Sequence, residues 1–393
     1  MGDRLAVDGG TPVRRSILPY GRHEIDEADV AAVAAALRAD WITSGPRVAE
    51  FEDAVARLAG VPHAIAVSSG TAALHTAVFA AGIGPDDEVV VPPLTFAATA
   101  NAVIYQGGTP IFADIRPDTL NLDPAAASAA VTPRTRAIIG VDYAGQPGDL
   151  DALRELGRTH GLCVIEDAAH ALGGAYRDRP VGVDADLAVF SFHPVKHATT
   201  GEGGAVTTAN AGFAERARRF RNHGIASTPL DRRDWRYEMV DLGFNYRLTD
   251  IQCALGLSQL ARLSQFAMRR AAVARRYCAA FADVTGLTVP TVAAHVRHAW
   301  HIFPVLLDLD SLRVGRAEVF AALRAEGIGV NVHYIPVYWH PYYRDRGYRR
   351  GLCPVAEQAY ERLLSLPIFP MMSDGDVDDV ITAVAKVLGH YTR

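Results

Sequence analysis

Lysine is almost absent from this sequence. Of its 39 Lys and Arg residues only two are lysine, Lys196 and Lys386. Arginine stays protonated and is a poor nucleophile, whereas a buried lysine can lose its proton and attack a carbonyl. A retained lysine is therefore a candidate for chemistry, with chance survival as the alternative. Lys386 lies in DDVITAVAKVLGHY, a predicted amphipathic helix, where we expect a solvated surface charge, so Lys196 is the candidate.

Other features are also lacking. The net charge is −5, so no basic surface for nucleic acid or an anionic membrane is indicated. No apolar run reaches the length of a membrane span, and the N-terminus carries no apolar signal region. The four cysteines lie far apart without metal or redox spacing, which is typical of free thiols in a reducing cytoplasm. We therefore expect a cytoplasmic enzyme that binds neither nucleic acid nor membrane.

Helical and strand patterns alternate from about residue 24 to residue 290. Residues 25–40 predict a helix, and a second helix opens at Thr43-Ser44-Gly45-Pro46 and stops at Gly60. This alternation predicts an α/β fold with a mainly parallel sheet, which binds ligands at the carboxyl ends of its strands. The expected strands are Ala64–Val67, Glu88–Val91, Pro110–Ala113, Ala137–Val141, Leu162–Glu166 and Leu187–Phe192.

The pattern changes in the last third of the chain. A long helical stretch from Thr249 to about Ala282 suits a helix that links two domains. It is followed by a strand at Trp300–Leu309, a helix at Arg316–Glu326, a strand at Gly329–Ile335, an aromatic loop and two helices. We expect a large α/β domain in residues 1–250, a linking helix in 251–285 and a smaller α+β domain in 286–393.

Two motifs follow predicted strands. In VSSGTAALHTAVFAAG, the turn Ser68-Ser69-Gly70-Thr71 leads into a helix whose first N–H groups favour a phosphate, although a plain helix cap is the alternative. In LCVIEDAAH, a buried strand ends at Glu166 and Asp167, and His170 follows. Because neighbouring strand residues face opposite ways, we expect Asp167 to point into a site and Glu166 away from it. An acidic cap of the next helix is the alternative.

The third motif, SFHPVKHATTGEGGAV, contains Lys196. Ser191 ends a strand and is a candidate for a phosphate hydrogen bond, and Gly201, Gly203 and Gly204 would let the loop fold tightly. GEGG lacks the Lys and Ser/Thr of a P-loop, and the segment also fails the dinucleotide-binding pattern. A lysine amine, an acid and a phosphate-binding turn together indicate pyridoxal 5′-phosphate (PLP), with the acid keeping the pyridine nitrogen protonated.

Two further patterns are weaker. His295, His298 and His301 recur every three residues, but no acid or cysteine completes a ligand set, so we expect no metal and interpret them as polar packing or substrate contacts. The aromatic stretch Tyr334–Tyr348 has the side chains to stack bases. Without a basic patch, a sugar or a nucleotide diphosphate is the better partner.

With SSGTAAL, EDAAH and SFHPVKHATTGEGG in this order, the chain resembles the DegT/DnrJ/EryC1/StrS family of nucleotide-sugar aminotransferases. The resemblance runs nearly end to end, through WITSGPRVAEFE, TFAATANAV and GFNYRLTDIQCALGLSQL to VNVHYIPVYWHPYY. It implies the type I fold of PLP-dependent aminotransferases and a homodimer with shared active sites.

The resemblance also implies residue roles. Lys196 matches the lysine that holds PLP as a Schiff base, Asp167 the partner of the pyridine nitrogen, and His170 the neighbour of the ring hydroxyl. Phe96 matches the aromatic residue stacked on the ring. Related dehydratases carry His at the lysine position, so Lys196 favours an aminotransferase.

Contacts to the phosphate and the sugar nucleotide are implied in the same way. The phosphate contacts match Gly70, Thr71 and Ser191, with Asn245 reaching the phosphate of the neighbouring subunit. The sugar-nucleotide side matches Tyr20, Trp41, Thr43, His333 and Tyr334.

The reaction so implied transfers the amino group of L-glutamate to a UDP-linked 4-keto-6-deoxy sugar. The products are a 4-amino-4,6-dideoxy sugar nucleotide and 2-oxoglutarate. The alternatives are another nucleotide-linked keto-sugar with its keto group at C3 or C4, a PLP enzyme of another reaction type such as a dehydratase, and a non-catalytic PLP-binding regulator.

Overall fold

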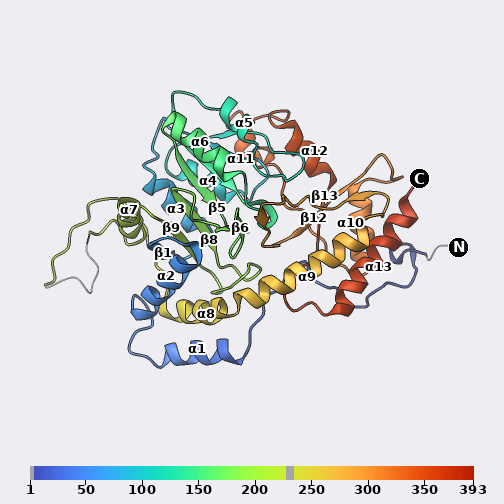
Figure 1. The fold of residues 1–393 in the computed structure, drawn as a ribbon, viewed down its shortest axis with the longest axis horizontal. Coiled ribbons are helices and arrows are strands. Elements are labelled where there is room, and N and C mark those ends of the chain that lie inside the picture. The colour runs from blue at the N-terminus through green and yellow to red at the C-terminus, as the bar shows by residue number, and fades with distance from the viewer. Residues whose placement is uncertain (1–3, 227–233) are drawn as a thin grey trace.

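A seven-stranded sheet forms the centre of the computed structural model, which describes residues 4–226 and 234–393. Its strand order is β1-β9-β8-β5-β4-β2-β3 (Figure 1). All neighbours from β8 to β3 are parallel, and only β9 runs antiparallel to both of its neighbours. The prediction of a mainly parallel α/β sheet is confirmed. The strands are β1 (His63–Val67), β2 (Glu88–Val91), β3 (Thr109–Phe112), β4 (Thr135–Val141), β5 (Cys163–Asp167), β8 (Leu187–Ser191) and β9 (Gly204–Thr208).

Helices cover both faces of this sheet because its strands are apolar on both sides. In β1, Ile65 and Val67 pack with one group of helices, while Ala64 and Ala66 pack with the other. The first group is α3 (Gly70–Ala80), α4 (Ala98–Tyr105) and α7 (Ala211–Arg221). The opposite face is covered by α2 (Pro46–Ala59), α5 (Pro124–Ala129), α6 (Leu150–His160) and α8 (Asp250–Ala261).

The predicted single linking helix is wrong, because the structure has two helices there. The chain leaves helical geometry at Arg262, between α8 and α9 (Leu263–Phe281). The Arg262 guanidinium pairs with Glu24, Asp26 and the fully buried Asp29. The break therefore ties α8 to the N-terminal helix α1 (Glu27–Leu37), against which α8 packs.

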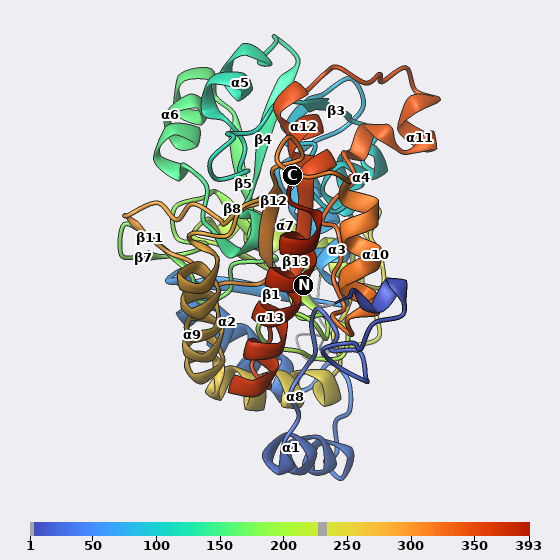
Figure 2. The same cartoon turned by 90° about the vertical axis from the view of Figure 1, so that its right-hand side faces the viewer.

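A second, antiparallel sheet lies at the far end of α9. It consists of β10 (Leu287–Thr288), β12 (Phe303–Leu307) and β13 (Leu363–Leu366). It shares a hydrophobic cluster with α9, α10 (Arg316–Ala325) and α13 (Asp374–Tyr391), and Figure 2 shows α13 in front of β12 and β13 with α9 to their left. The division into residues 1–250, 251–285 and 286–393 stays a proposal: this separate cluster favours it, but residues 337–356 pack on the large sheet instead. No helix of the described residues has the length and apolar character needed to cross a bilayer.

The predicted strand at 329–335 is also wrong. Only one bridge, between Asn331 and Ser365, joins this segment to β13, because Gly329 bonds the N-terminal segment through Leu18 and residues 331–334 line a cavity. The chain then crosses to the large sheet, where Val337, Tyr338, Tyr343, Cys353 and Ala356 join its core. The remaining elements are η1 (Ala6–Asp8), η2 (Tyr143–Gly145), η3 (Val337–Trp339), β6 (Ala175–Tyr176), β7 (Arg179–Pro180), β11 (Val296–Arg297), α11 (Pro341–Arg344) and α12 (Pro354–Arg362).

The expectation that Lys386 is a solvated surface charge is wrong as well. Its side chain is 13% exposed, and its amine lies 2.9 Å from the fully buried carboxylate of Glu326. That carboxylate also accepts hydrogen bonds from the backbone N–H groups of Ala6 and Val13. The helix face that carries Lys386 is covered because α13 packs against α10. The Glu326–Lys386 ion pair thus fastens the N-terminal residues to the C-terminal part of the chain.

Candidate active site

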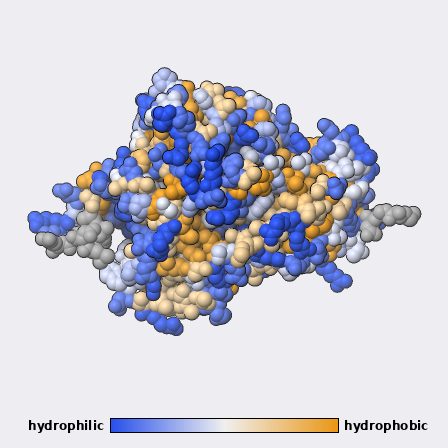
Figure 3. All heavy atoms as spheres, viewed as in Figure 1, coloured by the Kyte–Doolittle hydropathy of each residue, from blue (hydrophilic) through white to orange (hydrophobic). Residues whose placement is uncertain are grey.

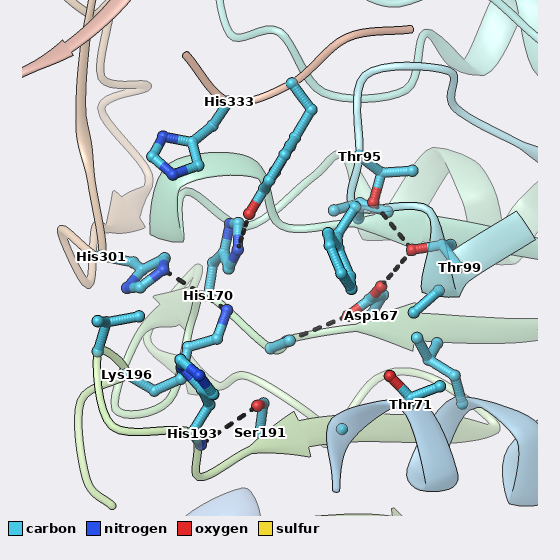
Figure 4. A pocket seen from close by; sticks show the side chains of 18 of the residues that line it. Thr71, Thr95, Thr99, Asp167, His170, Ser191, His193, Lys196, His301 and His333 are labelled. Carbon is cyan, nitrogen blue, oxygen red and sulfur yellow. Dashed lines mark hydrogen bonds between the residues drawn. The ribbon is translucent and has the colours of Figure 1, made fainter. Parts of the chain in front are cut away.

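A cavity of about 580 Å³ opens at the carboxyl ends of the central strands. The three motifs that sequence analysis singled out converge on it, as Figure 4 shows. A turn before α3, the end of β5 and the loop after β8 supply one side, and residues 331–334 supply another. The predicted site residues that line it are Tyr20, Gly70, Thr71, Phe96, Asp167, His170, Ser191, Lys196, His333 and Tyr334.

The side chain of Lys196 points into this cavity. The residue is only partly buried because it lines the opening, and its amine lies 3.5 Å from Nε2 of His301 (Figure 4). Burial lowers the pKa of this amine to about 8, while the carboxylate of Asp167 raises it and the guanidinium of Arg270 lowers it further. More of this amine is thus unprotonated near neutral pH than for an ordinary lysine, which favours its use as a nucleophile or general base.

Asp167 occupies the last position of β5. One oxygen accepts a hydrogen bond from the hydroxyl of Thr99 at 2.8 Å, and Thr99 in turn lies 2.8 Å from the hydroxyl of Thr95. Burial raises the pKa of Asp167, while the bonds from Thr99 and Ala169 and the charge of Lys196 lower it. The neighbouring Glu166 faces away, as predicted, and accepts a bond from the N–H of Gly182.

A second acid lies behind Asp167, and sequence analysis missed it. Asp142 follows β4, and its N–H donates to the carbonyl of Asp167. Oδ2 of Asp142 and Oε1 of Glu166 are buried without a donor, and the two side chains interact with each other. Burial raises the pKa of both carboxyl groups, which favours a protonated carboxyl in this pair.

The turn before α3 is built for close approach. The side chain of Ser69 caps the helix by accepting a hydrogen bond from the N–H of Ala72. The alternative prediction for this turn, a plain helix cap, is therefore also correct. Gly70 and Thr71 are the first helical residues, whose N–H groups have no intrahelical acceptor. A Cβ at Gly70 would lie 2.9 Å from that of Ser191, and one at Gly204 would lie 2.3 Å from the carbonyl oxygen of Ser69. Glycine is therefore required where this turn meets β8 and β9.

The residues of the cavity fit PLP. Helix N–H groups and the Ser191 hydroxyl form a cradle for a phosphate. The ring of Phe96 is 60% exposed on the cavity wall, an unusual position for a large apolar side chain unless a flat group covers it. Two further groups match the cofactor. Asp167 is a buried acid that suits a pyridine nitrogen, and Lys196 supplies an amine that can condense with an aldehyde.

Neutral imidazoles line the other side. Nε2 of His170 lies 3.2 Å from the Tyr334 hydroxyl, and the rings of His170 and His301 are 4.3 Å apart. Burial lowers the pKa of both histidines well below the usual value, and that of His333 to about 4. Of the three regularly spaced histidines only His301 reaches the cavity, and His298 stacks on Trp300. Within residues 4–226 and 234–393, no His, Cys, Asp and Glu side chains group as metal ligands would.

Three predicted site residues do not line this cavity of the single chain. Asn245 pairs with Asn222 beyond α7, Thr43 bridges to Thr249, and Trp41 is 48% exposed. Apolar side chains gather over α1 and α8 on the face shown in Figure 3. Exposed apolar residues on and beside α1 are Ile25, Val30, Leu37, Trp41 and Ile42.

This fold and site define a PLP-dependent aminotransferase of fold type I. The chain belongs to the DegT/DnrJ/EryC1/StrS aminotransferase family, whose pattern matches residues 23–385. The spore coat polysaccharide biosynthesis protein SpsC of Bacillus subtilis is 44% identical over 381 residues, covering 95% of this chain and 98% of SpsC.

Solved structures agree with this assignment. Helicobacter pylori PseC, an aminotransferase involved in the biosynthesis of pseudoaminic acid, superposes with a TM-score of 0.89 at 31% identity, covering 96% of this chain and all of that one. The PLP form of Spr1654, a putative sugar aminotransferase from Streptococcus pneumoniae, gives a TM-score of 0.88 at 29% identity, with 95% and 99% covered. The protein is thus a sugar aminotransferase that uses PLP.

Proposed function

We propose that the protein transfers the amino group of L-glutamate to C4 of a UDP-linked 4-keto-6-deoxy sugar. The product would be UDP-4-amino-4,6-dideoxy-N-acetyl-β-L-altrosamine, which belongs to pseudaminic acid biosynthesis. The meeting of Lys196, Asp167 and the phosphate-binding turn in one cavity supports the amino transfer. The likeness to PseC, together with SFHPVKHATTGEGG and NVHYIPV, supports the sugar.

Each residue contributes a defined step. Bound PLP supplies the electron sink for the negative charge that develops when a C–H bond beside the amine breaks. Lys196 would take the proton from Cα of glutamate and pass it to C4′ of the cofactor, and in the second half-reaction it would move a proton from C4′ to C4 of the sugar. Asp167, fixed by Thr99, holds the proton at the pyridine nitrogen. His170 would neighbour the ring hydroxyl of bound PLP, and Phe96 would cover one face of its ring.

The cavity of one chain lacks the positive charges that its substrates require. Among the described residues that line it, Lys196 is the only Lys or Arg. A glutamate carboxylate and a nucleotide diphosphate are bound most strongly by charged donors. We propose a homodimer in which the partner subunit completes the site and in which Asn245, Trp41 and Thr43 act on the neighbouring cavity. The exposed apolar residues around α1 support such an interface.

Complementation tests this dimer. K196A and N245A should each be inactive alone, but co-expression should restore activity because a hybrid dimer contains one intact site. No recovery in hybrids shown to form would contradict the shared site. Tyr20, His333 and Tyr334 remain the proposed sugar-nucleotide contacts within the chain.

The amino transfer has a direct spectroscopic test. The purified protein should show a visible absorbance band of bound PLP that disappears on addition of L-glutamate, with formation of 2-oxoglutarate. K196A should lose both the covalent band and turnover, and retained transamination in K196A would refute the assignment. Failure to turn over any amino donor would instead favour a PLP-binding regulator.

The sugar is the open part of the proposal. SpsC, at 44% identity, acts in spore coat polysaccharide biosynthesis, so another nucleotide-linked keto-sugar with its keto group at C3 or C4 is the second candidate. A panel of keto-sugar nucleotides, assayed with glutamate, decides between them, because the proposed substrate should have the highest kcat/KM. We place the reaction in the cytoplasm, which suits four free cysteines.

A further inference from the structure

Arg270 is a fully buried arginine on α9 that forms no ion pair with the described residues. Its Nη1 donates to the carbonyl oxygens of Trp300, His301 and Ile368 at 3.0–3.1 Å. Its Nη2 lies 3.5 Å from the carbonyl oxygen of Val195. Burial of a charge is costly, and arginine is almost never fully buried unless it is paired. A cost of this kind is often retained at a functional site.

Three of the four acceptors of Arg270 belong to the two segments that carry the reactive amine and its neighbour, and the fourth, Ile368, follows β13. Val195 directly precedes Lys196, and the ring of His301, whose carbonyl oxygen accepts a bond from Arg270 at 3.0 Å, contacts the Lys196 amine. Arg270 itself is outside the cavity lining. It therefore joins both segments from behind, by hydrogen bonds that leave its charge uncompensated by any carboxylate of the described chain.

The charge of Arg270 persists at neutral pH. Burial lowers the pKa of its guanidinium only to about 10. A fixed cation disfavours a second one nearby, and Arg270 accordingly lowers the pKa values of Lys196, His197 and His301. Asp167 acts on Lys196 in the opposite direction. The titratable groups around the Lys196 amine are Asp167, His170, His193, His197, Arg270, His301 and His333.

We propose that Arg270 is a positioning residue for Lys196: its buried, unpaired charge disfavours protonation of the amine, and its hydrogen bonds hold the Val195 and His301 segments together around that amine. This inference rests on the proposed function only in taking Lys196 as the reactive amine. Burial alone would also favour the neutral amine, but Asp167 faces it and would favour the ammonium ion. Arg270 offsets that carboxylate.

Competitive acetylation measures this effect without turnover. The full-length, cofactor-free protein is treated with a trace of acetic anhydride at a series of pH values, with free phenylalanine as the reference amine. Mass spectrometry then reads the peptide of Lys196 separately from that of Lys386, the other lysine of the chain. The pH at half-maximal labelling is the pKa of the Lys196 amine.

Three variants separate charge from packing. R270Q removes the charge but keeps N–H donors, and R270K keeps the charge but loses the planar guanidinium group with its several donors. R269Q is the control: it removes the charge of the adjacent arginine, whose side chain donates to Met372 and Asp374 instead. We expect R270Q to shift the Lys196 profile upward by about one pH unit, which at pH 7 slows labelling about tenfold. R270K should stay close to the wild type, and R269Q should match it.

Two results would overturn the inference. One is a folded R270Q protein, verified by circular dichroism, whose Lys196 profile equals that of the wild type. The other is a wild-type profile centred at the ordinary lysine value of 10.5, which is decisive even if R270Q fails to fold. Because labelling needs neither PLP nor sugar, loss of the glutamate-dependent spectral change in the wild type would refute the proposed function and leave this result intact.

Discussion

The Glu326–Lys386 ion pair gives the sharpest test of the fold. The change is K386M, which keeps the length and apolar stem of the side chain but removes the amine. Glu326 would then remain fully buried, with the N–H groups of Ala6 and Val13 as its remaining partners. Breaking a buried pair by removing one partner costs roughly 3–5 kcal/mol, because an uncompensated charge stays behind.

The double variant K386M/E326Q isolates that charge. A glutamine at position 326 still accepts one backbone hydrogen bond but carries no charge, so the double variant should recover part of the lost stability. R158M is a matched control, because it removes one partner of an ion pair at the surface. The side chains of Arg158 and its partner Glu155 are 75% and 61% exposed. An exposed pair of this kind contributes little to stability.

Urea denaturation followed by circular dichroism measures these differences. K386M should unfold at a clearly lower urea concentration than R158M, and protease should release its N-terminal segment faster than in the wild type. If K386M loses less than about 1 kcal/mol, water reaches Glu326 and the ion pair is a surface contact after all. A double variant less stable than K386M would equally refute the reasoning.

Three further predictions concern the site. Burial raises the pKa of Glu166 to about 7, so the folded state binds more protons than the unfolded chain between pH 4.5 and that value, and stability falls as pH rises through this window. We therefore expect the difference in unfolding free energy between E166Q and the wild type, measured by urea denaturation, to change in favour of E166Q from pH 4 to pH 8. The same difference at both pH values would contradict this. F96A should change stability by only about 0.5 kcal/mol, because Phe96 is 60% exposed, yet weaken PLP binding severalfold in equilibrium dialysis. G204A places a Cβ 2.3 Å from the Ser69 carbonyl and should weaken PLP binding, whereas G84A, with open space around it, should not.

The sequence predicted those elements whose signal is local. Six strands of the large sheet are apolar runs between helical patterns, and each lies within two residues of its expected bounds. Pro46 and Gly60 delimit α2 because their backbone preferences suit a helix start and stop. In contrast, β9 begins at Gly204 within a glycine cluster that was interpreted as a loop, and its antiparallel insertion between β1 and β8 depends on the whole sheet.

The same distinction holds for the site. Asp167 ends β5 and Lys196 lies in the loop after β8, both with recognisable neighbours, so local pattern sufficed for them. Asp142 and Arg270 act on the site from distant segments, and neither carries a signal in its own stretch of sequence. His301 stands in a repeat of three histidines, and that pattern does not tell which of the three reaches the cavity. The error at Lys386 has the same cause, since a helix of amphipathic pattern does not reveal that a carboxylate from another helix covers its polar face.

Because this protein has only two lysines, it offers few side-chain amines with which an aldehyde can react. Vitamin B6 aldehydes and reducing sugars condense with the amines that most proteins display in numbers on their exterior. Here one side-chain amine is engaged with Glu326 and the other faces the cavity, while arginine supplies the remaining basic groups. An aldehyde that meets this molecule therefore finds almost no competing lysine, and glycation or non-productive trapping of the vitamin on the outer surface is largely avoided.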